Sequence, residues 1–290
     1  MSHQQFREAN RLSWNEAIQA RNRHKGDDAT FFREGGNTLD PEERAFLGDI
    51  TGSSVVHLQC NCGEETLSLA QLGAIATGVD ISDTAIETAR SLSQSCGIPA
   101  TFHRMDVYDW LEQAVQATHR FDIVFCSYGS VIWLPDLSSW ARGIANILKT
   151  GGRFVLLEMH PTLLMFEHNW TLAFPYSSEG KALTFEEGMG DIVKHPSGHL
   201  EDVEEYTNPH PTYEYSWGIG EVVMALLEAG LSLAALKEYQ YAYTNGAYER
   251  MQRSSGGQWL PPPGMPNLPL RYGVPAQKNA HSQQASTISY

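Results

Sequence analysis

Long apolar runs, basic residues and cysteine are all scarce in this sequence of 290 residues. No apolar run approaches the roughly 18 residues that a membrane-spanning helix needs. The first residues, MSHQQFREAN, are polar and lack the apolar segment of a signal peptide. We therefore expect a cytoplasmic protein that does not interact with membranes.

Basic residues are outnumbered, since 20 Lys and Arg stand against 34 Asp and Glu and give a net charge of −14. Nucleic-acid binding depends on Lys and Arg that neutralise phosphates, so we expect no nucleic-acid partner. Among the four cysteines, Cys60 and Cys62 are close in sequence, but no further metal-ligating residues follow at a suitable spacing. The sequence therefore predicts reduced thiols and no metal site.

Strand and helix patterns alternate along residues 51–278. Short apolar runs typical of buried parallel strands are separated by segments with apolar residues at helical spacing, as at Leu137, Trp140, Ile144 and Leu148. This alternation predicts an α/β fold with a doubly wound, mostly parallel seven-stranded sheet whose last strand runs antiparallel. The predicted strands cover residues 55–58, 76–81, 100–107, 121–127, 153–159, 235–241 and 268–275.

Three segments are expected outside this core or inserted into it. We predict a helical N-terminal segment over residues 1–50, an insertion after the fifth strand over residues 160–216, and a flexible tail over residues 279–290. The insertion is rich in aromatic residues, which argues against disorder. These aromatic side chains could form an apolar lid over a ligand or a small satellite core.

The most informative stretch is the loop after the first strand, Gln59-Cys60-Asn61-Cys62-Gly63, which precedes a helix and the second strand that ends at Asp80. This order places backbone N–H groups and an acid where a nucleoside can lie across the strand ends. A dinucleotide site would need G-x-G-x-x-G around its pyrophosphate, so Gln59 and Asn61 disfavour a nicotinamide-dependent oxidoreductase. Asn61 is compatible with a left-handed backbone, whereas Gln59 is not expected there. The alternative is a plain βαβ unit whose loop is only a turn.

Motifs in the expected order resemble those of the class I S-adenosylmethionine-dependent methyltransferases. They are the loop from His57 to Gly63, then residues 78–82, 105–107, 121–128 and 148–154. The family's usual loop has an acid at the position of His57 and glycines at those of Gln59 and Asn61, and variants with Leu-Gln-Cys resemble a small-molecule subgroup. The resemblance implies a Rossmann-like methyltransferase fold with S-adenosyl-L-methionine as cofactor and S-adenosyl-L-homocysteine as product.

Carried over position by position, the resemblance implies contacts to each part of this cofactor. Asp80 would accept hydrogen bonds from both ribose hydroxyls, and Ile81 would pack on the adenine. Asp106 would accept from the adenine amine, with the Val107 N–H near a ring nitrogen; a helix-initiating acid is the alternative for Asp106. The residues expected around the methionine portion and the sulfonium are Gln59, Asn61, Gly63 and Ser127.

The segment before the first strand folds over the cofactor in many members of this family. The resemblance therefore implies that Trp14 could cover the ligand and that Arg33 or Lys25 could pair with the methionine carboxylate. An ordinary packing helix is the alternative for this segment.

In-line methyl transfer needs alignment of the acceptor with the methyl and the sulfur, and a base only where the acceptor carries a proton. Glu158 and His160 lie at the carboxyl end of the fifth predicted strand, so both are candidates for base or substrate ligand. For His160 a structural role is the alternative.

The sequence thus predicts a methyltransferase for a small organic acceptor, and it indicates neither which atom is methylated nor how many chains assemble. A cofactor- or metabolite-binding protein without turnover and a protein methyltransferase remain alternatives.

Overall fold

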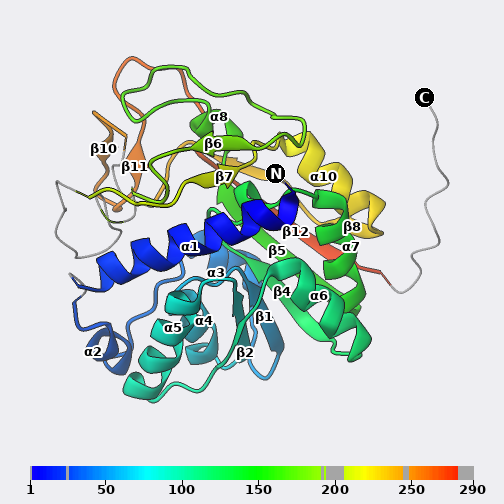
Figure 1. Cartoon of the computed structure of the whole chain (residues 1–290). Helices are drawn as coiled ribbons and strands as arrows, with labels where there is room; N and C mark the ends of the chain where they lie inside the picture. Colours follow the sequence, from blue (N-terminus) through cyan, green and yellow to red (C-terminus); the bar gives the residue numbers. More distant parts are fainter. Residues whose placement is uncertain (1, 24–25, 191–192, 194–205, 244–247, 280–290) are drawn as a thin grey trace.

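The computed structural model describes residues 2–23, 26–190, 193, 206–243 and 248–279. A central sheet crosses the molecule and carries helices on both faces (Figure 1). Its strands stand in the order β3 (Thr101–Arg104), β2 (Ile75–Asp80), β1 (Ser54–Leu58), β4 (Phe121–Cys126), β5 (Leu148–Met159), β12 (Arg271–Lys278) and β8 (Leu231–Leu233). A further strand, β9 (Lys237–Tyr239), pairs with β12 beyond the end of β8.

The predicted fold class is confirmed. Strands β1 to β5 are parallel, and β12 runs antiparallel to β5 on one side and to β8 and β9 on the other. The sheet therefore has seven positions, with β8 and β9 sharing the last. Of the strand predicted over 235–241 only β9 forms, and β8, which precedes that range, was not predicted.

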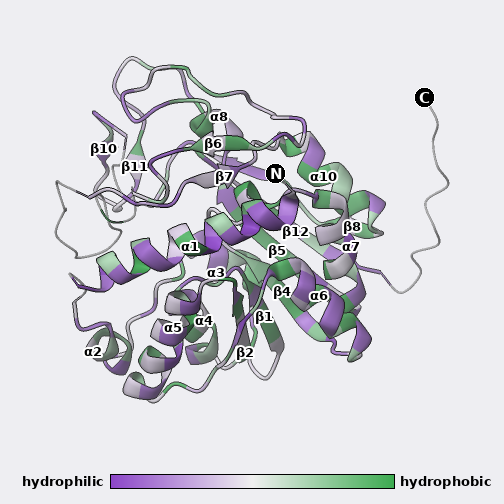
Figure 2. Cartoon of the chain, in the orientation of Figure 1, coloured by the Kyte–Doolittle hydropathy of each residue, from purple (hydrophilic) through white to green (hydrophobic). Residues whose placement is uncertain are grey.

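The sheet separates two hydrophobic layers because alternate residues of each strand point to opposite faces. On one face Val56, Leu58 and Val124 pack under helices α6 (Val107–Gln116), α7 (Leu137–Ile147) and α10 (Ile219–Glu228). On the other face Val55 and Leu157 pack with helices α3 (Pro41–Leu47) and α4 (Glu64–Gln71). Figure 2 shows the hydrophobic residues gathered along the central strands, as strands buried on both faces require.

The N-terminal segment forms helices α1 (His3–Asn22), α2 (Asp28–Arg33) and α3. Ser2 and Gln5 form a capping box that fixes the start of α1. This helix lies across the upper edge of the sheet in Figure 1 and packs against α5 (Asp83–Cys96) and β7 (Thr212–Glu214). None of the helices in the described ranges is long and apolar enough to cross a membrane.

The segment after β5 contains α8 (Pro161–Leu164) and the small sheet of β6 (Leu183–Phe185) with β7. A short turn, η1 (Val131–Trp133), follows β4, and a hairpin of β10 (Gln252–Arg253) and β11 (Trp259–Leu260) precedes β12. Lys25, residues 191–192 and 194–205 of the insertion, and the tail from residue 280 lie outside the described residues.

Candidate functional site

The loop after β1 has an unusual backbone. Gln59, Asn61 and Gly63 all have positive φ angles, at 57°, 48° and 80°. The two side chains that replace glycine make compensating hydrogen bonds. Gln59 Nε2 donates to the Ser130 carbonyl at 2.8 Å, and Asn61 Oδ1 accepts from the Cys62 N–H at 2.7 Å. The role of Gln59 could not be predicted from the sequence, because its partner lies 71 residues further along the chain.

Gly63 is required for a second reason as well. It caps the start of α4, and a Cβ at this position would stand 2.7 Å from a ring carbon of Phe102 and 2.8 Å from the Cβ of Ala89. Real Cβ atoms do not approach other atoms so closely, so only glycine allows α4 and α5 to pack at this spacing.

Asp80 stands at the end of β2, directly beside this loop. Its Oδ2 accepts from the Asn61 N–H at 2.9 Å, and its Oδ1 accepts from the Ser82 N–H at 2.8 Å. Burial raises the pKa of Asp80, and the backbone donors act in the opposite direction. Each carboxylate oxygen keeps a second lone pair, so Asp80 can still accept from two hydroxyl groups. Ile81 follows it and is half-buried.

Asp106 caps helix α6, where its side chain accepts from the Tyr108 N–H at 2.9 Å. Val107 is the first residue of that helix and is buried. The same carboxylate oxygen of Asp106 pairs with Arg7 Nη1 of α1 at 2.5 Å. Burial raises the pKa of Asp106, although Arg7 acts against this. The helix-initiating role is therefore present.

A chain of buried polar groups links β1, β4 and α4. His57 Nδ1 lies 3.0 Å from Thr66 Oγ1, and His57 Nε2 lies 3.0 Å from Ser127 Oγ. Ser127 in turn donates to Glu65 Oε2 at 2.9 Å. Because the Ser127 hydroxyl donates to Glu65, it accepts from Nε2 of His57. His57 Nδ1 is then the acceptor for Thr66.

Burial holds the pKa of His57 at about 3, so the ring is neutral at physiological pH. Burial also raises the pKa of Glu65 to about 7, with the charges of Glu64 and Asp40 adding to the effect and the Ser127 hydroxyl opposing it. Where the family's loop usually has an acid, this chain has a neutral histidine and supplies the carboxylate from α4. Sequence reasoning missed Glu65, because nothing in its local pattern separates it from a surface acid of a helix.

Helix α1 covers the loop and the end of β2. Trp14 packs edge-on against Trp133 at a ring distance of 5.7 Å and contacts the buried cluster that includes Cys62. Asn15 Oδ1 accepts from the Ser82 hydroxyl at 2.7 Å, and Arg11 forms an ion pair with Asp83. The structure therefore places Trp14 over the predicted site.

The structure does not bring Arg33 to the loop. It lies on α2, where Nη1 donates to the carbonyl of Ser95 at 3.1 Å. Ser95 belongs to the last turn of α5, whereas the first turn of that helix follows the end of β2. Arg21 on α1 is the cation beside the loop instead, with Nη2 3.7 Å from Glu64 Oε1 and a side chain that is 15% exposed. Helix α1 runs past the loop whereas α2 lies beyond it, which spacing along the sequence could not show.

Glu158 is buried in β5 and holds the turn after β4. Its Oε2 accepts from the N–H groups of Gly129 and Met159 at 2.5 and 3.2 Å, and its Oε1 accepts from Val131 N–H at 3.0 Å. Burial raises the pKa of Glu158 to about 8, against the effect of these donors. Both oxygens accept from backbone N–H groups and the residue is only 2% exposed, so the prediction of Glu158 as a base is not supported. It positions the turn whose Ser130 carbonyl receives Gln59.

His160 is likewise committed to structure. Its Nδ1 accepts from the Thr162 N–H at 3.1 Å and so caps α8, while Nε2 lies 2.8 Å from Glu238 Oε1. Burial lowers the pKa of His160, although Glu238 acts against this. Since both ring nitrogens are engaged and only 3% of the side chain is exposed, His160 does not have the free nitrogen that a base needs. The structural alternative holds.

The aromatic residues of the insertion divide between two places. Trp170 and Phe166 belong to a satellite core with Leu163 and Leu270. Tyr213 stacks on Phe6 of α1 at a ring distance of 4.3 Å, and its backbone is bound on both sides by the Asn10 side chain. The insertion therefore holds α1 in place, and Phe166 and Trp170 contribute to a small separate core.

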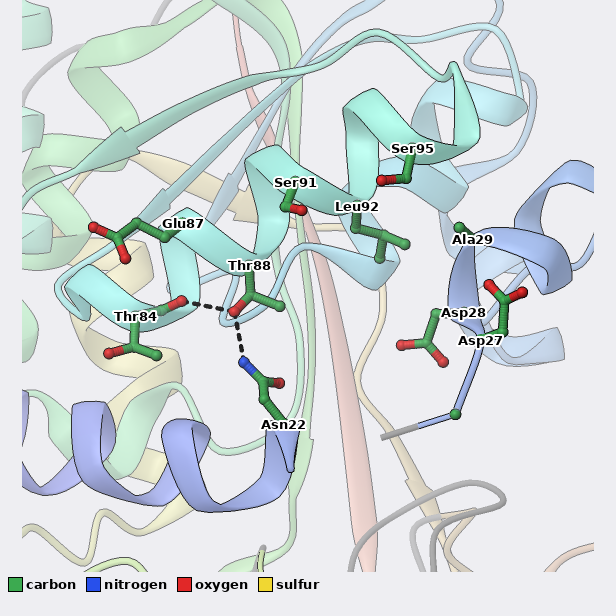
Figure 3. Close-up of a pocket in the computed structure, with 11 residues that line it drawn as sticks. Asn22, Asp27, Asp28, Ala29, Thr84, Glu87, Thr88, Ser91, Leu92 and Ser95 are labelled. Carbon is green, nitrogen blue, oxygen red and sulfur yellow. Dashed lines mark hydrogen bonds between the residues drawn. The ribbon is translucent and has the colours of Figure 1, made fainter. Parts of the chain in front are cut away.

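A surface hollow of about 480 Å³ lies away from the loop, between the end of α1, α2 and the flank of α5 (Figure 3). Its lining consists mainly of short polar side chains, and Asn22 donates to Thr88 across it at 2.8 Å. The hollow contains neither the loop nor Asp80, so it is distinct from the predicted site.

Residues 55–152 match the model of the family described as "Methyltransferase domain". These residues span β1 to the turn within β5 and include the loop, Asp80, Asp106 and Ser127. This match covers about a third of the chain, and over these residues the chain is similar to a methyltransferase domain. The chain has the Rossmann-like sheet that was predicted from the sequence.

Curated relatives cover part of the chain. A ubiquinone biosynthesis O-methyltransferase of Glaesserella parasuis serovar 5 (strain SH0165) is 30% identical over 129 residues, which are 43% of this chain and 54% of the relative. An S-adenosyl-L-methionine-dependent Diels-Alderase, iccD, of Talaromyces variabilis is 32% identical over 111 residues, 37% of each chain. The chain thus spans about half of the length of the curated relatives that it matches, or less.

Solved structures agree in fold over more of the chain. The CcbJ methyltransferase from Streptomyces caelestis superimposes with a TM-score of 0.58 at 14% identity, over 93% of this chain and 99% of its own. An S-adenosylmethionine-dependent methyltransferase from Mesorhizobium loti does so with a TM-score of 0.52 at 17% identity, over 82% of this chain and 96% of its own.

Proposed function

We propose that this chain is an enzyme that transfers a methyl group from S-adenosyl-L-methionine to a small organic acceptor. One observation carries the proposal: the left-handed loop, Asp80 and the covering helix α1 meet at one edge of the sheet. A carboxylate can accept hydrogen bonds from the ribose hydroxyls of a nucleoside. Backbone groups nearby can bind the polar chain that the nucleoside carries. The family match and the curated relatives named as O-methyltransferases support the same class of reaction.

Unpaired polar atoms at this edge fit such a cofactor. Gln59 Oε1 and Ser130 Oγ are buried and have no hydrogen-bond partner among the described residues. They follow β1 and β4, next to the loop. An ammonium group, such as that of the cofactor's methionine portion, would supply the donor that Gln59 lacks and could also bind the serine oxygen.

Each part of the cofactor has a candidate partner in this arrangement. Asp80 would bind the ribose hydroxyls, and Ile81 and Val107 would border the adenine. The loop with Ser127 would surround the methionine portion. Arg21, rather than Arg33, would face the carboxylate, since it lies beside the loop and is mostly buried.

When bound, the cofactor supplies a methyl group on a positively charged sulfur. The chain's own part is to align the acceptor and to exclude water, and α1 serves the second purpose. The ion pairs of Arg7 with Asp106 and of Arg11 with Asp83 fasten this helix. Arg7 and the Tyr108 N–H both bind Oδ1 of Asp106, so an adenine amine would bind at Oδ2. If the acceptor carries a proton, Glu65, with its pKa at about 7, is a better base than Glu158 or His160.

Isothermal titration with S-adenosyl-L-homocysteine tests the proposal. Asp80→Ala should weaken binding at least tenfold, because two ribose hydrogen bonds to a carboxylate are lost. Glu112→Ala is the control, since Glu112 has an exposed side chain on α6, and its binding constant should stay at the wild-type value. Absence of binding by the wild-type protein at millimolar ligand would overturn the proposal.

A second candidate function is cofactor-dependent binding without methyl transfer. It is favoured by the commitment of Glu158 and His160 to structure, and one relative is named for a Diels–Alder reaction rather than for methylation. Tritium from labelled cofactor should appear in small molecules of a metabolite extract if the chain is a small-molecule methyltransferase. Label in protein would favour a protein methyltransferase, and retention of all label on the cofactor would favour binding without transfer.

A further inference from the structure

A second group of polar side chains, which we call the Arg271 cluster, lies at the same edge of the sheet. Its centre is Arg271, the first residue of β12, which pairs with Met159 at the carboxyl end of β5. The other members are carboxylates from the start of α3 and tyrosines that follow β4 and β9; they are Asp40, Glu42, Glu43, Tyr128, Tyr239, Tyr241 and Tyr243.

Four tyrosine rings surround the Arg271 guanidinium. Its Cζ atom lies 4.6 Å from the ring centre of Tyr128, 5.0 Å from Tyr243, 5.6 Å from Tyr239 and 6.0 Å from Tyr241. Arg271 is 1% exposed, whereas all four tyrosines are half-buried. The guanidinium therefore lies beneath a layer of aromatic side chains that themselves reach the surface.

The hydrogen-bonding capacity of the guanidinium is only partly used. Nη2 donates to Asp40 Oδ2 at 2.6 Å, but Nε and Nη1 have no hydrogen-bond acceptor among the described residues. Glu42 Oε2 is also buried without a donor and lies 3.9 Å from Nη1. A buried charged donor and a buried charged acceptor are costly to leave unpaired. Their separation is too long for a direct hydrogen bond and suits one bridging atom.

The charges of the cluster restrict what that bridging atom can belong to. Arg271 is positive, Asp40 and Glu42 are negative, and burial together with the neighbouring carboxylates raises the pKa of Glu43 well above its usual value. An anionic group would be repelled by Asp40 and Glu42, and a cationic group by Arg271. A hydroxyl group is neutral, accepts from Nη1 and donates to Glu42, so it satisfies both orphaned atoms at once.

The cluster also lies next to the proposed methyl-transfer site. Tyr128 directly follows Ser127, and the Tyr128 hydroxyl donates to Asp40. The charge of Glu65 in the site contributes to the raised pKa of Glu43 in the cluster. A ligand that rests on the tyrosines would thus be held over the ends of β4, β5 and β12, beside the end of β1 where the cofactor is proposed to bind.

We propose that the Arg271 cluster is the acceptor subsite, and that it recognises an uncharged hydroxylated ring compound through a hydroxyl bridging Arg271 Nη1 and Glu42 Oε2. This inference rests on the proposed methyltransferase function. The tyrosine side chains supply apolar contact to the ring, and the buried ion pair reads the hydroxyl.

Four naphthalene probes that differ in one substituent test the subsite on the full chain saturated with S-adenosyl-L-homocysteine. Binding of each probe is measured by saturation-transfer NMR, and relative affinities are obtained by competition between the probes. 2-Naphthol should bind, and 2-methoxynaphthalene should bind about tenfold more weakly or worse, because an ether cannot donate to Glu42. 2-Naphthoate and 2-naphthylmethylammonium should be the weakest. Preference for either charged probe, equal binding of the phenol and its ether, or no binding of any probe would overturn the proposal.

Two variants locate the bound probe. Glu42→Ala should weaken 2-naphthol about fivefold or more and remove the discrimination against the ether, while Glu112→Ala on the exposed face of α6 should change neither. Arg271→Lys keeps the charge and should also lose the discrimination. Cofactor-product affinity and the thermal midpoint are measured for each variant. If the wild type binds the cofactor product but the Glu42 variant leaves probe binding unchanged, the subsite is wrong and the proposed function stands.

Discussion

The left-handed backbone at Gln59 gives a prediction in which the usual order of two substitutions is reversed. A residue with a Cβ costs about 1–2 kcal/mol in the left-handed region, whereas glycine is free to adopt it. Glycine in turn loses about 0.5–1 kcal/mol through the greater freedom of the unfolded chain. Gln59→Gly and Gln59→Ala both remove the hydrogen bond to Ser130, so that loss cancels in the comparison.

We therefore expect Gln59→Gly to be more stable than Gln59→Ala by about 0.5–1 kcal/mol. The comparison position is Glu87, an exposed residue in the interior of α5. There Glu87→Ala should be more stable than Glu87→Gly by about 1 kcal/mol, because helix propensity decides the order. The stability of the glycine variant relative to the alanine variant thus has opposite signs at the two positions. The two values differ by about 1.5–2 kcal/mol.

Equilibrium unfolding in urea measures these four free energies under identical conditions. The reasoning is refuted if the alanine variant at Gln59 equals or exceeds the glycine variant while the pair at Glu87 keeps its normal order. A reversal at both positions would instead point to an altered unfolded state. Binding of the cofactor product to both Gln59 variants then shows whether the amide or only the backbone matters to the loop.

Three further outcomes follow from the buried groups. Glu158→Ala should lower the free energy of unfolding by about 3 kcal/mol or more, because three buried N–H groups lose their acceptor; a loss below about 1 kcal/mol, as expected for the control Glu112→Ala, would contradict this. His160→Asn should be about 1 kcal/mol more stable than His160→Ala in urea unfolding, since asparagine also caps a helix; turnover abolished in a stable, cofactor-binding His160→Asn protein would restore the histidine as a base. Glu65 has a folded pKa raised from 4.5 to about 7, so its contribution to stability is present at low pH and is lost as the pH rises through about 7. Unfolding of Glu65→Gln at pH 5 and pH 8 should show a smaller loss between the two than the wild type does, and equal losses would contradict the shift.

The local patterns of the sequence determined the fold and the start of the site. Apolar runs and helical spacing predict nearly every strand of the sheet and the helices that pack on it. Each pattern indicates which residues of its own segment are buried. The loop and Asp80 are also local features: they follow consecutive strands, and parallel strands bring such ends to one edge. The family resemblance agreed with this arrangement, so the fold class could be predicted before any coordinates were known.

Tertiary structure alone decided which polar side chains are available for chemistry. Glu158 and His160 stand where the sequence places them, but Glu158 accepts from the turn after β4 with both oxygens, and His160 binds Thr162 and Glu238 of β9 through its two ring nitrogens. Arg33 lies away from the loop and Arg21 lies beside it because the path of α1 and α2 over the sheet depends on packing rather than on spacing. Arg271 meets Asp40 across 231 residues of sequence. Periodicity encodes which face of an element is buried, whereas such pairings depend on how buried faces fit together in space.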